Sequence, residues 1–273
     1  MIAKVSSVVA VLGLTVCCGA AAAQNGTSTY CSSAVPSQDL SSANSGQDYD
    51  RPVSWKRLVP NILCDQKQIW LFPIKAAEGH DWLPVVSVVG ATAGLATLDP
   101  AEGRYFHQSS GFQGFNNIFT SNGTALATLI APTSIYFAGL IRKDTKMQHT
   151  ALLAGEAVAD SEIVETVLKD ISNRARPSTF ANHSNYWDSW FEGKGSKVSG
   201  GGSFPSGHTI VAFSIATVVA HRYRTHRWVP YVAYGGAAVI AFSRLSLSAH
   251  FASDVFVGAA LGYSISRFAV LQY

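Results

Sequence analysis

Two histidines and one aspartate in the C-terminal third of the chain have the types and spacing that covalent catalysis requires. His250 and Asp254 are four residues apart, so on a helix they would lie on one face within contact distance. A carboxylate on one ring nitrogen fixes the histidine tautomer and leaves the other nitrogen free as a nucleophile. His208 also titrates near neutrality, and it could protonate a leaving group and then activate water. These residues predict a nucleophile, its orienting partner and a proton carrier.

Three cations, Lys169, Arg176 and Arg244, are predicted to meet at the same place. In an apolar protein they would repel one another unless a multiply charged anion lies between them. Phosphate is such an anion, because the planar guanidinium fork matches phosphoryl oxygens. Ser206 and the backbone N–H of Gly207 would add donors at a helix N-terminus. We therefore expect a phosphate site that requires neither a metal nor another cofactor.

Helices must position these side chains, since apolar segments separated by polar stretches predict an all-α protein. The expected helices cover residues 82–98, 124–141, 148–172, 208–220, 228–243 and 250–270. The last four are expected to form one antiparallel bundle with short connections. In such a bundle the end of one helix, the start of the next and the turn two helices later fall at the same end. The polar clusters should therefore converge into one pocket at one end of the bundle.

Three motifs, spread over residues 169–262, resemble the signature of a known superfamily. They are Lys169-x6-Arg176-Pro177, Pro205-Ser206-Gly207-His208 and Ser243-Arg244-x5-His250-x3-Asp254. In order and internal spacing they resemble the type 2 phosphatidic acid phosphatase and vanadium haloperoxidase superfamily. The one departure is Ser248, where members of the superfamily often have glycine.

The resemblance implies metal-independent hydrolysis of phosphate monoesters, soluble or lipid, through a phosphohistidine. By position it implies that His250 is the nucleophile, Asp254 its orienting partner and His208 the general acid. It implies that the phosphate is bound by Lys169, Arg176, Ser206, Gly207 and Arg244. Vanadate is expected to inhibit, because it resembles the five-coordinate transition state. The alternatives are a vanadium-dependent haloperoxidase, in which His250 would ligate vanadate, and a non-catalytic envelope scaffold.

The composition limits the remaining classes of function. The 273 residues include 20 Lys+Arg and 17 Asp+Glu, and they are 48% hydrophobic and 14% charged. Dominant disorder is excluded, and the absence of a long basic run argues against nucleic acid as a partner. So few charges favour helices hidden in a dense core or in lipid. Acidic residues in the 148–172 segment favour a soluble or peripheral protein over a membrane-spanning one.

The N-terminal part is expected to be separate from the catalytic helices. Residues 1–23 have the basic, apolar and small-residue order of a signal peptide, which predicts export to the periplasm or cell envelope. Residues 24–80 are expected to form a partly irregular arm, and residues 81–273 the helical domain. Cys31 and Cys64 would remain after cleavage, and a disulfide between them is the natural hypothesis, with two free thiols as the alternative.

The loop 177–204 contains a cluster of aromatic residues whose role the sequence leaves open. Its members are Tyr186, Trp187, Trp190 and Phe191. They could form a lid over the substrate or pack over the end of the bundle.

Overall fold

The computed structural model describes residues 53–79, 82–180, 186–191 and 202–271. All regular secondary structure in these residues is helical, so the predicted all-α class is confirmed. Residues 1–23, expected to be a signal peptide, and Cys31 lie outside the described residues. Cys64 is disulfide-bonded.

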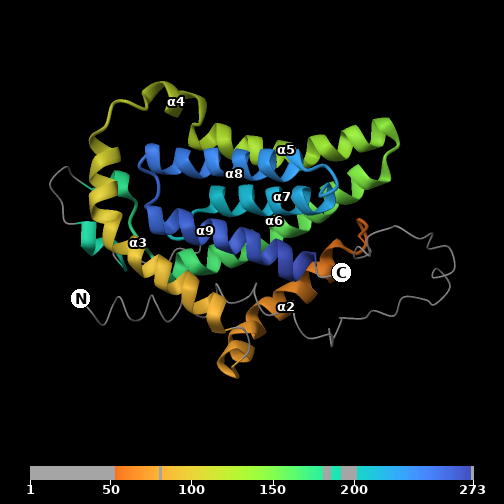
Figure 1. Cartoon of the computed structure of the whole chain (residues 1–273), viewed down its shortest axis with the longest axis horizontal. Helices are drawn as coiled ribbons and strands as arrows, with labels where there is room; N and C mark the ends of the chain where they lie inside the picture. The colour runs from red at the N-terminus through yellow and green to blue at the C-terminus, as the bar shows by residue number, and fades with distance from the viewer. Residues whose placement is uncertain (1–52, 80–81, 181–185, 192–201, 272–273) are drawn as a thin grey trace.

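Eight α-helices occur in the described part of the chain. They are α2 (Leu58–Ala77), α3 (Trp82–Gln108), α4 (Gln113–Ile118), α5 (Ser121–Arg142), α6 (Thr145–Ser172), α7 (Gly207–Arg222), α8 (Trp228–Ser246) and α9 (Ala252–Ser264). A π-helical segment, Ile265–Val270, continues α9. Helix α7 is central, since α6, α8 and α9 all pack against it, and α3 crosses beside α9 (Figure 1).

The core between α6, α7 and α9 consists of branched aliphatic side chains. Leu168, Ile210, Val257 and Leu261 belong to one buried cluster there. Helix α9 approaches α7 closely because glycine faces it: a Cβ on Gly262 would lie 2.4 Å from the Ile210 carbonyl oxygen. This close packing fixes the last turn of α9 against the first turns of α7.

Helix α2 occupies the part of the expected arm from Leu58 to Ala77, where Ile69 and Phe72 bury their side chains in the core cluster. One helix is longer than the sequence predicted. Helix α3 continues to Gln108 rather than ending at residue 98. The sequence prediction ended at the first charge, Asp99, but this carboxylate is buried and paired with a buried arginine, so the helix need not stop there.

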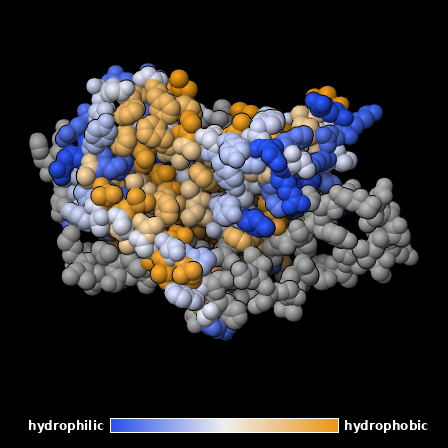
Figure 2. Space-filling model, viewed as in Figure 1, coloured by the Kyte–Doolittle hydropathy of each residue, from blue (hydrophilic) through white to orange (hydrophobic). Residues whose placement is uncertain are grey.

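The surface has a large exposed apolar component. Exposed apolar side chains occur on α3 and α8, including Trp82, Leu83, Val86, Trp228, Tyr231 and Val232. Figure 2 shows hydrophobic residues gathered left of the centre of that view, over α3 and α8, with hydrophilic residues toward both ends. In the described part of the chain α3 alone is long and apolar enough to cross a membrane, and 11% of its most apolar window is buried.

Candidate active site

The predicted site residues come together at one end of the bundle. They lie at the end of α6 (Lys169), in the segment after it (Arg176), at the start of α7 (Ser206, Gly207 and His208), at the end of α8 (Arg244) and around the start of α9 (His250 and Asp254). The Ser206 N–H donates to the carbonyl oxygen of Asp254 at 3.1 Å, which ties the start of α7 to the first turn of α9. The predicted site residues thus lie together at one end of the bundle, as expected for antiparallel helices.

His250 is buried and is held by the main chain rather than by a carboxylate. Its Nδ1 lies 2.6 Å from the carbonyl oxygen of Ser203 and 3.9 Å from Oδ2 of Asp254. The expected hydrogen bond from His250 to Asp254 is therefore not formed. The reason is local: α9 begins at Ala252, so His250 precedes the helix and does not have the four-residue helical spacing to Asp254.

The main-chain partner defines which ring nitrogen of His250 is reactive. A carbonyl oxygen can only accept, so Nδ1 must carry the proton and Nε2 must present its lone pair. Burial, followed by the charges of Lys169 and Arg176, holds the pKa of His250 well below its usual 6.5. The imidazole is therefore neutral at physiological pH, as a nucleophile must be.

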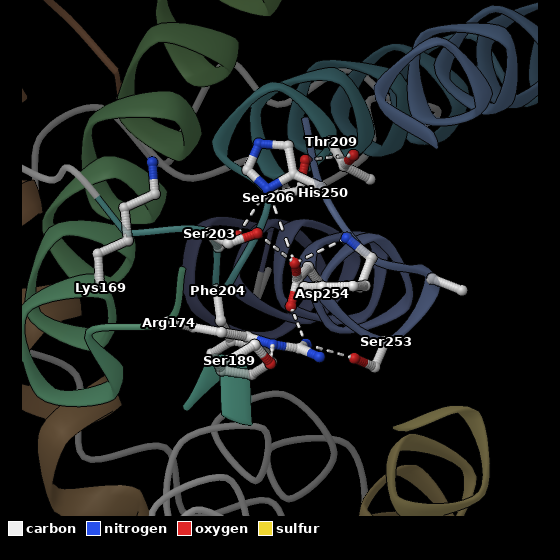
Figure 3. A network of polar contacts seen from close by, with 12 residues as sticks. Lys169, Arg174, Ser189, Ser203, Phe204, Ser206, Thr209, His250, Ser253 and Asp254 are labelled. Atoms are coloured by element: carbon white, nitrogen blue, oxygen red, sulfur yellow. Dashed lines mark hydrogen bonds and ion pairs between the residues drawn. The ribbon is translucent and has the colours of Figure 1, made fainter. Parts of the chain in front are cut away.

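Asp254 is buried, and its carboxylate binds groups other than the ring of His250. Oδ2 accepts hydrogen bonds from Oγ of Ser203 at 2.6 Å and from the Phe251 N–H at 2.8 Å. Oδ1 pairs with Nη1 of Arg174 (Figure 3). Asp254 therefore touches the residue that orients His250, and it acts on the ring through Ser203.

Arg244 has the features of an anion-binding residue. Its side chain is fully buried, and Nη2 donates to the Phe119 carbonyl at 2.8 Å and to Oγ1 of Thr124 at 2.9 Å. Nη1 is buried and has no hydrogen-bond partner among the described residues. Burial, and then the charge of Arg176, lowers the pKa of Arg244 to about 10, which still leaves it charged. A buried donor in this state favours an incoming anion.

Lys169 lies across from His250 (Figure 3). It forms an ion pair with Glu165, one turn earlier on α6. Glu165 also lies against Gly207, since a Cβ on that glycine would be 2.3 Å from Oε1. An anion that enters the site meets Lys169 next to this carboxylate. Glycine is needed at position 207 because the Glu165 side chain lies so close to the backbone there that no space remains for a Cβ.

The remaining predicted ligand positions are found at the start of α7. Ser206 is buried and precedes α7 as its N-cap residue, and its hydroxyl is 2.9 Å from that of Thr209. His208 follows in the first turn and is half-buried. The charge of His208 is among the influences that lower the pKa of His250, after the larger effects of burial, Lys169 and Arg176.

Two members of the aromatic cluster pack over the end of the bundle. Tyr186 is buried against Phe251, and Trp190 lies against Phe204 at 5.2 Å between ring centroids. Trp187 is exposed. Of the two roles that the sequence left open, a lid or packing over the end of the bundle, Tyr186 and Trp190 therefore have the second.

Three residues at the site were missed by the sequence analysis. Ser203 orients the histidine, Arg174 pairs with Asp254, and Asp99 pairs with Arg174. Arg174 lies between Lys169 and Arg176, so a second arginine in that motif was the available signal. Asp99 had a weaker signal, a lone acidic residue directly after an apolar segment.

The described residues contain no group of His, Cys, Asp or Glu that could hold a metal ion. The fold and the site define an all-helical protein whose bundle end places a neutral histidine beside cationic side chains. Residues 150–273 match the PAP2 superfamily, which the motifs in this part of the chain resembled. Members of this superfamily are typically phosphomonoester hydrolases.

One solved structure is similar to this chain, the "first transmembrane PAP2 type phosphatidylglycerolphosphate phosphatase from Bacillus subtilis". The likeness covers 67% of this chain and 92% of that one, with 19% sequence identity and a TM-score of 0.42. No curated protein matches the chain.

Proposed function

We propose that this protein hydrolyses phosphate monoesters through a covalent intermediate on His250. The observation that carries the proposal is the hydrogen bond from Nδ1 of His250 to the Ser203 carbonyl, because it leaves the Nε2 lone pair free. Lys169, Arg176 and Arg244 provide the positive charge that a phosphate dianion needs. Nη1 of Arg244, which has no hydrogen-bond partner in the part of the chain that the structure describes, is a donor of the kind that a phosphoryl oxygen would satisfy.

The reaction has two steps that share one acid–base group. In the first, Nε2 of His250 attacks phosphorus, the bond from phosphorus to the ester oxygen breaks, and His208 gives its proton to the leaving alkoxide. In the second, His208 takes a proton from water, whose oxygen attacks phosphorus, and the phosphorus–nitrogen bond breaks to release phosphate. Arg176 and Arg244 stabilise the charge on the equatorial oxygens in both steps.

The substrate class we propose is a phosphate monoester in the cell envelope. The exposed apolar side chains of α3 and α8 support access from a lipid surface, which would favour a lipid phosphate. A comparison of p-nitrophenyl phosphate with phosphatidic acid dispersed in detergent separates the two cases. Export by the segment 1–23 is part of the same proposal.

A rapid-quench comparison tests the assignment of the two histidines. With p-nitrophenyl phosphate, His208→Ala should accumulate an acid-labile phosphoenzyme while turnover falls by about 10²–10⁴-fold, since the water loses its base. His250→Ala should form no phosphoenzyme at all. His226→Ala is the matched control, because His226 is an exposed residue in the turn between α7 and α8. Labelling of the His250→Ala protein would disprove the proposed nucleophile.

A further inference from the structure

Arg174 is a buried cation at the site that the proposed reaction does not use. Nη1 donates to Oγ of Ser253 at 2.8 Å and pairs with Oδ1 of Asp254, and Nη2 pairs with Oδ2 of Asp99 at 2.7 Å. Nε donates to Oγ of Ser189 at 3.2 Å. Every one of these partners is buried. The guanidinium is therefore fixed at all three of its nitrogens.

Both faces of the same guanidinium are covered by aromatic rings. Its central carbon lies 4.1 Å from the ring centroid of Trp190 and 4.1 Å from that of Phe251. These stacked rings exclude water and add cation–π attraction. Each nitrogen of Arg174 is therefore bonded within the protein and neither face of the guanidinium is open to substrate, which argues against a direct role in binding phosphate.

Asp99 holds Arg174 from a helix outside the segment that matches the superfamily. It lies on α3, is 1% exposed, and also binds the start of α9. Its Oδ1 accepts from the Ser253 N–H at 3.1 Å, and its Oδ2 accepts from Oγ of Ser253 at 2.5 Å. One carboxylate thus fixes both the arginine and the first turn of the helix that carries Asp254.

These contacts form a continuous path to the nucleophile. Asp99 pairs with Arg174, Arg174 pairs with Asp254, Asp254 accepts from the Ser203 hydroxyl, and the Ser203 carbonyl accepts from His250 (Figure 3). Burial raises the pKa of Asp254 to about 6, and the charge of Arg174 opposes this effect. Without Arg174, the buried carboxylate would lose the cation that keeps it charged.

We propose that Arg174, anchored by Asp99, is a positioning residue that holds Asp254 and Ser203 in the arrangement required to orient His250. This inference rests on the proposed role of His250 as the nucleophile. Loss of the Arg174 charge would let Asp254 and Ser203 relax, so the Ser203 carbonyl would no longer hold the ring. The phosphate ligands would remain in place, because none of them bonds to Arg174. The defect should therefore be in the rate of phosphoryl transfer and not in binding.

Three variants of the full-length protein test this with p-nitrophenyl phosphate. The rate of the first p-nitrophenol burst should fall by about 100-fold in Arg174→Gln, the loss expected when a reacting group is misplaced by about 1 Å. Asp99→Asn, which removes the charge but keeps one acceptor oxygen, should show a smaller fall of about tenfold on the same scale. Arg174→Lys should recover part of the rate because it restores the charge. KM and inhibition by inorganic phosphate should stay within about twofold of wild type in each variant, since ground-state binding is not altered.

Glu102→Gln is the matched control on the same helix. Glu102 lies one turn after Asp99 and approaches the Ala252 N–H at 3.4 Å. Burial, and then the charge of Asp99, raises the pKa of Glu102 to about 8, so its carboxyl is mostly neutral at pH 7 and glutamine replaces it closely. This variant should have the wild-type burst rate.

The outcomes separate this inference from the proposed function. A wild-type protein without phosphoenzyme disproves the function, whatever the variants do. If wild type forms the phosphoenzyme and a folded Asp99→Asn or Arg174→Gln protein reacts at the wild-type rate, the positioning role is wrong. It is also wrong if Asp99→Asn fails to fold, as judged by its thermal melt, because the pair would then be needed only for the structure. A parallel rise in KM would instead assign Arg174 to binding.

Discussion

The reactive ring of His250 is fixed by a main-chain oxygen, which no side-chain substitution can remove. Replacing Ser203 changes only the hydroxyl that binds Asp254, and the carbonyl that accepts from Nδ1 remains. Asp254, the carboxylate expected to bind the ring, acts on it only through Ser203. Substitution of Ser203 itself therefore leaves the acceptor for Nδ1 in the chain, whereas the position of that acceptor depends on the groups behind Ser203.

Residue spacing predicted the side chains that lie together at the end of the bundle but not the groups behind them. His250, His208, Lys169 and Arg244 were predicted, since their types are rare in apolar helices and their spacing matches a known signature. The Ser203 carbonyl was not predicted, because main-chain groups have no residue-type signal. Ser248 was noted only as a departure, and it occupies the left-handed region at φ 51°, where glycine is favoured.

Gly207→Ala tests the tight contact at the start of α7. The added Cβ would displace the Glu165 carboxylate, and with it the Lys169 ion pair, while the flexible glutamate side chain lets the fold survive. We expect kcat/KM for p-nitrophenyl phosphate to fall by about tenfold, or about 1.4 kcal/mol, with little change in Tm. Gly155→Ala is the control, because no atom lies within 4 Å of the Cβ it would add on α6. Wild-type kinetics in Gly207→Ala would contradict the close approach.

At the scale of elements, the site depends on how tightly α9 packs against α7. Gly258 and Gly262 both face α7, and a Cβ on Gly258 would lie 2.8 Å from the Ser206 carbonyl oxygen. The first turn of α9 carries Asp254 and the start of α7 carries Ser206, so the spacing of two helices sets the geometry of the pocket. Apolar periodicity predicted that both helices exist, but it has no information on the distance between their axes.

Gly262→Ala should destabilise the protein by pushing these helices apart. The new methyl would meet the main-chain oxygen of Ile210 at 2.4 Å, and a backbone atom cannot rotate away. We expect a loss of about 2–3 kcal/mol in the free energy of unfolding, as for an overpacked core. Gly235→Ala on α8, whose Cβ would meet nothing within 4 Å, should instead stabilise by about 0.5–1 kcal/mol. Urea denaturation measures both, and equal stabilities would refute the packing argument.

At the scale of the whole molecule, exposed apolar side chains are numerous. Exposed Trp82, Leu83 and Val86 occur together on α3, and the basic residues Arg142 and Lys143 lie at the turn between α5 and α6. Low charge in the sequence predicted helices hidden from water, without deciding between core and lipid. In the structure much of this apolar surface is exposed, because only one side of α3 packs against the core.

Contact between α3 and lipid can be tested by flotation with neutral phosphatidylcholine vesicles, for which protein charge is unimportant. The wild-type protein should float with the vesicles. Leu83→Gln combined with Val86→Gln should reduce the floating fraction severalfold, because the variant buries less apolar surface in the lipid. Thr97→Gln, at an exposed polar position on the same helix, should leave flotation unchanged. A wild-type protein that stays at the bottom of the gradient would exclude this contact.

The pairing of Asp99 with Arg174 has a consequence for the modularity of the chain. The segment that matches the superfamily begins at residue 150, yet one of the two carboxylates that neutralise its buried arginine is supplied by α3. Grafting residues 150–273 onto a foreign N-terminal half would therefore carry over a guanidinium with a missing counter-charge. A working chimera requires an acidic residue on the incoming helix at the turn that faces Arg174, so the two halves of this protein can be exchanged only as a matched pair.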